Sequence, residues 1–323
     1  MLSTETFISW AKELGFAEAG FCRPDPFTYA QKIVASQESL SERRQLRFSP
    51  TEDFPQAKSI AVLLWPYIQA QLPEQEGIVF VDSYYAASNA AYHAAKALEE
   101  RMLASGCFAK ANVSYPAKEA AIRAGMGVIG RNSLLITPAY GSRVVIILMV
   151  TGIEIPCLPI DSSVGSCAEC GRCTKACPVG AIDDKGMTHP QRCLRNFMME
   201  GVVVPEQIRS KIGMRMIGCD ICQRVCPMQP EGKQQTGQQF SLREFLTEDP
   251  AAFSNAVASL AHEIGRNTAR PQRVRAQAAL LAGNSKDKSY LPILRSWARM
   301  SFEAVRQHAL WAIEQIESAD ADT

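Results

Sequence analysis

The sequence predicts an α/β N-terminal domain over residues 1–160, a cysteine-rich domain over residues 161–230 and an all-α C-terminal module over residues 240–323. Three observations carry this prediction. Helical and strand patterns alternate in the first part, eight cysteines gather in the second, and helical periodicity alone remains in the third. The chain has 323 residues, 47% of them hydrophobic and 21% charged, which suits a folded protein with a substantial core.

The predicted elements of the N-terminal domain are three helices and two strands. Apolar residues at helical spacing predict a first helix that ends at Gly15, and Ala-rich segments predict helices over residues 83–105 and 117–124. Residues 59–65 and 144–150 are short, continuous apolar runs, which predict buried strands. The longest apolar run is far too short to cross a bilayer, so we expect no membrane association.

The C-terminal part has the pattern of packed helices that follow a polar linker at residues 231–239. Breaks are expected at residues 283–285 and near Ser301. The three apolar-faced helices are expected over residues 269–281, 290–300 and 302–316. Paired helices of this kind predict one or two HEAT-like units, which must pack on the rest of the protein to bury their apolar faces.

Net charge and cysteine usage indicate the compartment. The formal net charge is +1, so no global field attracts nucleic acid or a membrane. The first residues lack the basic and apolar stretches of a secretory signal. Eleven cysteines in such a chain indicate metal ligation in a reducing compartment, and we expect the cytoplasm.

The first cysteine run contains Cys167, Cys170, Cys173 and Cys177, followed by Pro178. This is the Cys-x2-Cys-x2-Cys-x3-Cys-Pro spacing of two-cluster ferredoxins. In that pattern the first three thiolates bind one [4Fe–4S] cluster and the fourth binds the other.

The second run lacks one cysteine. Cys219, Cys222 and Cys226 have the spacing of the second, third and fourth ligands, and Cys193 lies upstream. An insertion between Cys193 and Cys219 costs little closure entropy if its ends meet. We therefore assign Cys167, Cys170, Cys173 and Cys226 to one [4Fe–4S] cluster, and Cys177, Cys193, Cys219 and Cys222 to the other.

A zinc site is the alternative, because paired Cys-x2-Cys elements also bind zinc. Two features favour iron–sulfur clusters: Cys-Pro occurs at the end of both runs, and eight thiolates fill two cubes. Cys22, Cys107 and Cys157 fall outside the pattern, and we expect them to be buried structural thiols.

Gly125, Gly127 and Gly130 match the G-x-G-x-x-G fingerprint of dinucleotide-binding proteins. That fingerprint follows a strand and precedes an acidic residue about twenty positions on. Here a predicted helix precedes the glycines, and no aspartate occurs between residues 83 and 160. A nicotinamide site is therefore disfavoured, although three glycines still permit close approach of another element or a flat cofactor.

Taken together, several segments resemble those of a known family. They are residues 10–16, 57–67, 124–133, 138–142, 218–227, 279–284 and 305–311. On these segments the chain resembles the epoxyqueuosine reductases, cobalamin- and iron–sulfur-dependent enzymes that complete queuosine in tRNA. The resemblance runs almost from end to end.

The resemblance implies an oxidoreductase with a cobalamin-binding α/β domain, a ferredoxin-like domain with two [4Fe–4S] clusters, and a HEAT-like module. The clusters would relay electrons from a low-potential donor to a base-off cobalamin, whose nucleophilic Co(I) reduces the epoxide to the alkene with loss of water. The expected partner is the anticodon region of tRNA, and we expect a monomer. The candidate corrin-facing residues are Gly125, Gly127, Gly130, Arg131, Asn132, Tyr140 and Ser142.

One departure from the family pattern concerns the acid that protonates the leaving oxygen. Family members carry an aspartate in an Asp-x-x-Pro element before the glycines, whereas this chain has Asn112-Val-Ser-Tyr-Pro116. Because the leaving oxygen must be protonated, another donor is needed. The candidates are Tyr115, Glu119 and, through a water molecule, Ser114. A surface tyrosine and a solvated glutamate are the alternative interpretations.

The C-terminal module has the only marked charge asymmetry. Between His262 and Trp311, nine Lys and Arg side chains stand against three Asp and Glu, a net charge of +6. A local basic face suits contact with phosphates, although a solvated helix surface has the same composition. The candidate tRNA contacts are Arg266, Arg270, Arg273 and Arg275.

Two other functions remain open at this point. The absent aspartate would suit a corrinoid iron–sulfur reductase of another substrate. An electron-transfer or corrinoid-handling protein without substrate chemistry is the third candidate, but such a carrier does not need a basic C-terminal module.

Overall fold

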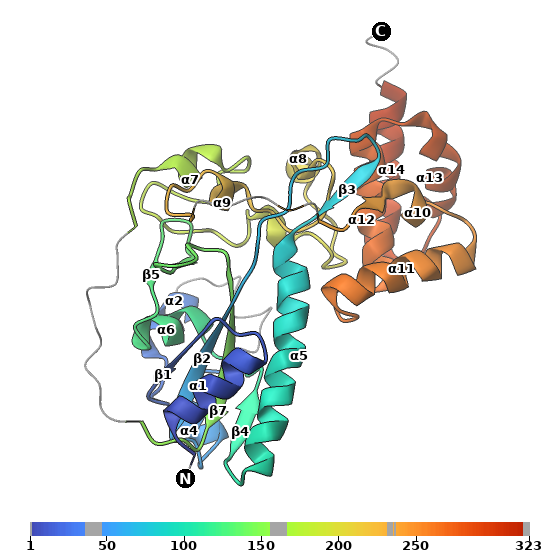
Figure 1. Cartoon of the computed structure of the whole chain (residues 1–323). Coiled ribbons are helices and arrows are strands. Elements are labelled where there is room, and N and C mark those ends of the chain that lie inside the picture. The colour runs from blue at the N-terminus through green and yellow to red at the C-terminus, as the bar shows by residue number, and fades with distance from the viewer. Residues whose placement is uncertain (1, 36–46, 156–166, 231–234, 236, 319–323) are drawn as a thin grey trace.

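The computed structural model describes residues 2–35, 47–155, 167–230, 235 and 237–318 (Figure 1). The N-terminal part is built on a four-stranded sheet in the order β1-β2-β7-β4. Its strands are β1 (Glu18–Cys22), β2 (Ser59–Pro66), β4 (Ala109–Ala111) and β7 (Val144–Thr151). The two long apolar runs are the central strands β2 and β7, as predicted. Every neighbouring pair is antiparallel, so this is not the parallel sheet that alternating helices and strands usually form.

Helices cover both faces of this sheet, which explains why the central strands are apolar throughout. Successive residues of β2, such as Leu63 and Leu64, point to opposite faces of the sheet and enter separate hydrophobic cores. Helices α1 (Thr4–Glu13) and α5 (Ser83–Ala104) contribute to one core, and α6 (Ala117–Arg123) contributes to the other. The short helices α2 (Thr28–Ala35) and α4 (Pro50–Asp53) lie in the connection between β1 and β2.

A second, three-stranded sheet joins parts of the chain that are far apart in sequence. Its order is β8-β3-β9, with bounds β3 (Ile78–Val81), β8 (Arg215–Ile217) and β9 (Phe240–Ser241). Strand β3 pairs in parallel with β8 and antiparallel with β9. This sheet therefore takes one strand from each of the three predicted regions, so those regions are structurally interleaved.

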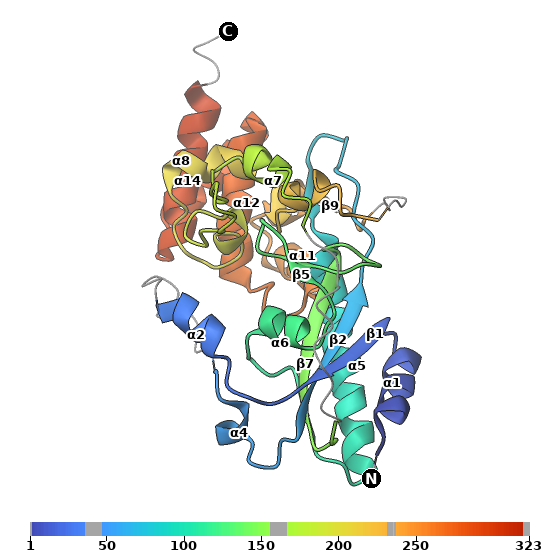
Figure 2. The same ribbon diagram turned by 90° about the vertical axis from the view of Figure 1, so that its left-hand side faces the viewer.

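The cysteine-rich segment folds as short helices and turns. They are α7 (Arg172–Ala176), η1 (Leu194–Asn196), α8 (Glu206–Arg209), η2 (Ser210–Ile212) and α9 (Ile221–Arg224). A small hairpin of β5 (Val128–Ile129) and β6 (Leu135–Ile136) follows α6. In both ribbon views β5 lies between α6 and helix α7 (Figures 1 and 2).

The C-terminal helices share one hydrophobic core with the cysteine-rich segment. This core contains Val79, Ile212 and Leu280 together with side chains from the other C-terminal helices. The elements are α10 (Leu242–Phe245), α11 (Pro250–Ile264), α12 (Pro271–Ser285), η3 (Lys288–Tyr290), α13 (Leu291–Trp297) and α14 (Glu303–Ser318).

The predicted break at residues 283–285 is wrong, because α12 continues through Gly283 to Ser285. A Cβ atom at Gly283 would lie 2.7 Å from the Trp311 ring and 2.9 Å from Cα of Ala312. The glycine therefore allows α12 and α14 to approach closely and does not end the helix. Residues 231–234 and 236 of the predicted linker lie outside the described residues.

Candidate iron–sulfur and substrate site

The first set of cysteines surrounds one pocket. Cys167, Cys170, Cys173 and Cys226 all line it, so the structure brings Cys226 to the three cysteines of the first run. Burial raises the pKa of the Cys226 thiol, and the charges of Cys167, Cys173 and Cys170 raise it further. Thiols this close together suit shared ligation, because a bound metal cluster stabilises the thiolates that otherwise repel one another.

The second set lies beside the first. Burial raises the pKa of Cys219 to about 11, and the nearby charge of Cys193 contributes to this rise. The charge of Cys177 contributes to a raised pKa of Cys193. The Cys177 Sγ accepts a hydrogen bond from the Ala181 N–H at 3.2 Å. Burial raises the pKa of Cys222 as well, and the charges of Cys219, Cys193 and Cys173 add to this effect. Cys222 of the second set therefore lies near Cys173 of the first set.

The cysteine side chains of the two sets do not converge on a single point. Among the residues that the structure describes, no three Cys, His, Asp or Glu side chains are placed to hold a single metal ion. Cys22 is buried, as expected for a structural thiol, and burial raises its pKa to about 12. Cys107 is only partly buried, and Cys157 lies outside the described residues.

The insertion between Cys193 and Cys219 is held by the C-terminal helices. Side-chain amides of α12 donate to its backbone: Gln277 to the Arg215 oxygen at 2.8 Å, and Asn284 to the oxygens of Arg209 and Gly213 at 3.1 and 2.9 Å. The ring of His308 accepts from the Val204 N–H at 2.9 Å. These contacts offset the entropy lost when the insertion is closed, and they fix the end that carries Cys219.

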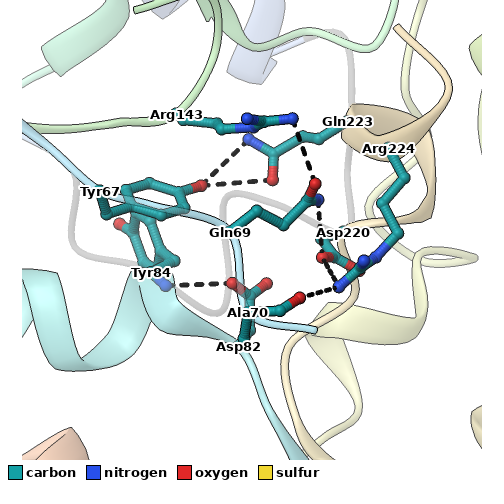
Figure 3. Close-up of polar contacts among 9 residues, drawn as sticks. All are labelled: Tyr67, Gln69, Ala70, Asp82, Tyr84, Arg143, Asp220, Gln223 and Arg224. Atoms are coloured by element: carbon teal, nitrogen blue, oxygen red, sulfur yellow. Dashed lines mark hydrogen bonds and ion pairs between the residues drawn. The ribbon is translucent and has the colours of Figure 1, made fainter. Parts of the chain in front are cut away.

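A buried polar network joins the second cysteine run to the N-terminal sheet (Figure 3). Asp220 forms an ion pair with Arg224 at 2.7 Å and accepts a hydrogen bond from Gln69 at 2.9 Å. Arg224 also donates to the Ala70 oxygen at 2.7 Å, and Arg143 donates to Gln69 at 3.2 Å. Helix α9, which carries Cys222, is thus fixed to the chain that follows β2.

Asp82 lies at the edge of this network, where it caps α5 by accepting the Tyr84 N–H at 3.0 Å. Burial and the neighbouring charge of Asp220 raise the pKa of Asp82 to about 6. Gly218 packs directly on this carboxylate with φ +88°, and a Cβ atom there would lie 2.3 Å from Cβ of Asp82. The residue before Cys219 therefore has to be glycine.

Ser142, a candidate corrin contact, is also part of the interface with α9. Gln223 donates to the Ser142 carbonyl oxygen at 2.8 Å and lies 3.1 Å from the Tyr67 hydroxyl. Gln229 donates to Ser142 Oγ at 2.6 Å. The buried Ser142 hydroxyl thus has partners within the protein, and its contribution is to hold the cysteine segment against the sheet.

The three glycines of the G-x-G-x-x-G match have different surroundings. A Cβ atom at Gly127 would lie 2.4 Å from the Ile136 oxygen, and one at Gly130 would lie 2.6 Å from the Ile136 side chain. The β5–β6 hairpin therefore requires Gly127, because the contact is with backbone, whereas a Cβ atom at Gly130 would displace the end of the Ile136 side chain. Gly125 follows α6 with φ +68°, and no atom of the described residues lies within 4 Å of its Cβ position, so of these three glycines it alone borders open space in the described part of the chain.

Two further candidate corrin contacts, Arg131 and Asn132, lie where the β5–β6 turn meets the cysteine segment. Arg131 donates to the Asp184 oxygen, and both Arg131 and Asn132 line the pocket of the first cysteine set. Asn132 is 6% exposed, and Tyr140 is partly buried. Tyr140 packs against the hydrophobic core between the sheet and α6.

Both named proton-donor candidates have structural partners. Tyr115 is buried and donates to Asp53 at 2.6 Å; burial and the Asp53 carboxylate raise the pKa of its hydroxyl. Glu119 accepts from the Ala30 N–H at 2.9 Å and pairs with Arg123 at 2.6 Å, which fixes α2 against α6. Ser114 is exposed. A role for any of them in proton donation stays a prediction.

The basic candidates of the C-terminal module differ in exposure. Arg266 and Arg270 are exposed, whereas Arg273 lies 4.0 Å from Glu200. Arg275 is stacked at 4.0 Å on the Phe253 ring, and burial lowers its pKa.

Among the described residues, no helix is both long and apolar enough to cross a membrane.

The fold and the two neighbouring cysteine sets define an iron–sulfur protein. Residues 166–229 match the family model described as a 4Fe-4S double cluster binding domain. The chain is 30% identical to the epoxyqueuosine reductase of Bacillus subtilis, over 97% of this chain and 87% of that protein. It is 27% identical to the epoxyqueuosine reductase of Listeria monocytogenes, over 98% and 90% of the two chains. The chain belongs to the epoxyqueuosine reductase family.

Solved structures of this enzyme have the same fold. A selenomethionine-labelled epoxyqueuosine reductase matches with a TM-score of 0.80 at 26% identity, over 97% of this chain and 90% of that one. A second epoxyqueuosine reductase, solved with an epoxyqueuosine-modified tRNA-Tyr stem loop, matches with a TM-score of 0.78 at 25% identity, over 97% and 89%. A third, from Bacillus subtilis, was solved with its catalytic aspartate loop swung out of the active site.

The polar residues that fix α9 were not among the residues predicted to be functional. The second cysteine run contains Asp220, Gln223 and Arg224, and this position among the cysteines could have indicated that they support the site. Their partners Gln69 and Asp82 are far away in sequence, and no local pattern marks them.

Proposed function

We propose that this chain reduces epoxyqueuosine in tRNA to queuosine, with electrons supplied through two [4Fe–4S] clusters. The reaction takes up two electrons and two protons: the epoxide oxygen leaves as water, and an alkene forms. The observation that supports this most is the near full-length match to epoxyqueuosine reductases, together with eight cysteines gathered in two adjoining sets.

The cluster ligands are Cys167, Cys170, Cys173 and Cys226 for the first cluster, and Cys177, Cys193, Cys219 and Cys222 for the second. The grouping of the thiols supports this assignment, since each set contains the cysteine that crosses over from the other run. The Ala181 N–H, which donates to Cys177, would stabilise its thiolate.

The proposal includes cobalamin held by residues 1–160, a ferredoxin-like domain over residues 161–230 and a HEAT-like module over residues 240–323. Bound cobalamin would supply the nucleophilic, low-valent chemistry that cleaves a carbon–oxygen bond. The open side of Gly125 and the partly buried Tyr140 fit a flat ring system at this position. Gly127, Gly130, Arg131, Asn132 and Ser142 would support that wall from behind, through the contacts described above.

Proton donation is assigned to this chain's own side chains, because the Asp-x-x-Pro aspartate is replaced at Asn112-Val-Ser-Tyr-Pro116. Tyr115 has a hydroxyl proton but shares it with Asp53, so it is a weak acid at rest. The variant Tyr115→Phe keeps the ring that stacks on Phe27 and removes only the hydroxyl. A loss of kcat without a change in KM would support Tyr115 as the donor.

Substrate tRNA would contact the exposed arginines Arg266 and Arg270, with Arg273 and Arg275 beside them. The relative solved with a modified stem loop supports an RNA partner of this kind. The anticodon region as the part bound, the low-potential donor, the monomeric state and the cytoplasmic location stay predictions from the sequence.

The test is turnover. The protein is reconstituted anaerobically with iron, sulfide and cobalamin, reduced with a low-potential donor, and given a tRNA stem loop that carries epoxyqueuosine. Formation of queuosine is the expected result. Cobalamin binding without turnover would favour a reductase of another substrate, and absence of cobalamin binding would favour an electron carrier.

A further inference from the structure

Helix α5 carries an exposed aromatic side chain outside the hydrophobic cores of the described residues. Residues such as Ala91 and Ala95 face the sheet, which leaves Tyr92 on another side of the helix. Tyr92 is 45% exposed, and its ring meets the ring of His93 edge-on, with centroids 5.4 Å apart at an angle of 90°. A tyrosine ring left in water is available to a partner, because burying it would contribute stability.

Positive charge lies one turn further along α5. The buried carboxylate of Glu99 accepts a hydrogen bond from Lys96 at 3.0 Å and from Lys110 at 3.3 Å, as well as from a backbone N–H of β4 at 2.8 Å. Two lysines therefore share one carboxylate, and both remain partly exposed. The exposed acid of α5 is Glu100, about two turns from Tyr92. The surface beside Tyr92 thus has an excess of positive charge.

The C-terminal module reaches α5 one turn before Tyr92 (Figure 1). Asn89 of α5 donates to the His262 oxygen at 3.0 Å. A Cβ atom at Gly265 would lie 3.1 Å from Oδ1 of Asn89, so the end of α11 packs closely on this turn. Arg266, an exposed candidate tRNA contact, follows directly. The surface that carries the arginines is therefore continuous with the surface around Tyr92.

Tyr92 also contacts the segment in which the family's aspartate is replaced. Asn112 follows β4 with φ +56°, and its Nδ2 donates to the Tyr92 oxygen at 3.2 Å. Residues 112–116 therefore begin against the same turn of α5. Along α5, Tyr92 thus lies between the arginines of the C-terminal module and the segment to which we assign proton donation.

We propose that the exposed ring of Tyr92 stacks on an unpaired base of the bound RNA. The inference rests on the proposed function and deepens it, because it names where the N-terminal domain contacts the RNA. The bases of a single-stranded loop expose their faces, and aromatic side chains stack on them with little regard to sequence. Lys96 and Lys110 supply positive charge for the phosphates of the same strand.

The test measures RNA binding by fluorescence anisotropy at several salt concentrations, with the full chain reconstituted anaerobically with iron and sulfide. The probes are an unmodified RNA stem loop and a blunt-ended duplex of the same stem. Tyr92→Ala removes the ring but keeps the carbonyl oxygen that accepts from Asn112, and Tyr92→Phe keeps the ring. Leu103→Ala is the matched control, since Leu103 is 51% exposed near the other end of α5.

Tyr92→Ala should weaken binding of the stem loop by about tenfold, whereas Tyr92→Phe and Leu103→Ala should bind as wild type does. The log–log salt dependence should keep its wild-type slope in Tyr92→Ala, because a stacked ring displaces no counterions. Binding of the duplex should be the same in wild type and Tyr92→Ala, since the duplex offers no unpaired base.

Stem-loop binding equal to wild type in Tyr92→Ala would overturn the inference. Equal weakening for the stem loop and the duplex would also overturn it, because the side chain would then support the protein surface and not contact a base. Either result leaves the proposed function standing if wild type converts the epoxyqueuosine form of the stem loop. If wild type binds neither RNA, the proposed function itself fails, and the inference fails with it.

Discussion

His308 of helix α14 accepts a hydrogen bond from the backbone N–H of Val204, with 2.9 Å between the nitrogens. Its other ring nitrogen lies 2.9 Å from the Ala276 oxygen, to which it donates. The neutral ring therefore joins the insertion that precedes Cys219 to two helices of the C-terminal module. Burial lowers the pKa of His308 to about 4, and nearby Arg209 contributes.

The first prediction concerns pH and His308. Because the folded-state pKa lies below the unfolded value of about 6.5, the unfolded chain binds more protons between these values. The contribution to stability is therefore complete above about pH 6.5 and is lost as the pH falls toward 4, by on the order of 3 kcal/mol. Thermal unfolding followed by tryptophan fluorescence should show wild type losing more stability from pH 7 to pH 5 than His308→Gln. An equal loss in both proteins would contradict this assignment.

The second prediction concerns Asp82, whose pKa is shifted in the opposite direction. Its folded-state pKa of about 6 lies above the ordinary value, so the contribution of the protonated group is lost as pH rises from about 4 through 6. Asp82→Asn keeps the cap on the Tyr84 N–H and removes the repulsion from Asp220. At pH 7.5 the variant should be more stable than wild type by about 2–3 kcal/mol and should therefore unfold at a higher temperature. This difference in stability should shrink at pH 5. A variant less stable than wild type at pH 7.5 would mean that attraction to Arg224 outweighs the repulsion.

The third prediction concerns Gly218, which lies between Asp82 and Cys219. Gly218→Ala adds a Cβ atom that overlaps Asp82 and places alanine at positive φ, so the loop that carries Cys219 must shift. We expect loss of about half the iron per chain. Gly106→Ala is the matched control, since Gly106 has φ +77° but no atom of the described segments within 4 Å of its Cβ position. The Gly106→Ala variant should lose only about 1 kcal/mol of stability through backbone strain and should keep its iron. Full iron content in Gly218→Ala would be the contrary result.

The fourth prediction concerns the cysteine assignment. Cys193→Ala and Cys226→Ala should each reduce iron from about eight to about four per chain, because each removes a ligand of a different cluster. The double variant should lose nearly all of it. Cys22→Ala is the control, since Cys22 is buried away from both sets and should leave iron content unchanged. Zinc in place of iron in anaerobically purified protein would reject both clusters.

The fifth prediction concerns the exposed arginines. Arg266→Ala and Arg270→Ala should each weaken binding of a tRNA stem loop and reduce its log–log salt dependence by about one unit for each lost phosphate contact. Lys58→Ala removes one exposed charge at the start of β2 and is the control. Binding by fluorescence anisotropy between low and moderate salt measures the slope. Slopes equal to wild type in both arginine variants would place the RNA elsewhere.

Local patterns predicted much of the architecture. The apolar runs became the central strands β2 and β7, and the Ala-rich segments became α5 and α6. These predictions succeed because a strand buried on both faces needs a continuous apolar run, which a single sequence displays. The break predicted at Gly283 was wrong because residue type alone does not distinguish a glycine required by close helix packing from a glycine that ends a helix.

The cysteine spacing, the family resemblance and the replacement of the family's aspartate can all be read directly from the chain, because they depend only on residue identity and order. The pairing of β3 with both β8 and β9 became visible in the folded chain alone, as did the hydrogen bonds by which the C-terminal helices hold the insertion before Cys219. The reason is physical. Cysteines spaced within one turn are brought close by the local backbone alone. Contacts between residues distant in sequence depend on how the elements pack, and they leave no periodic pattern in the chain.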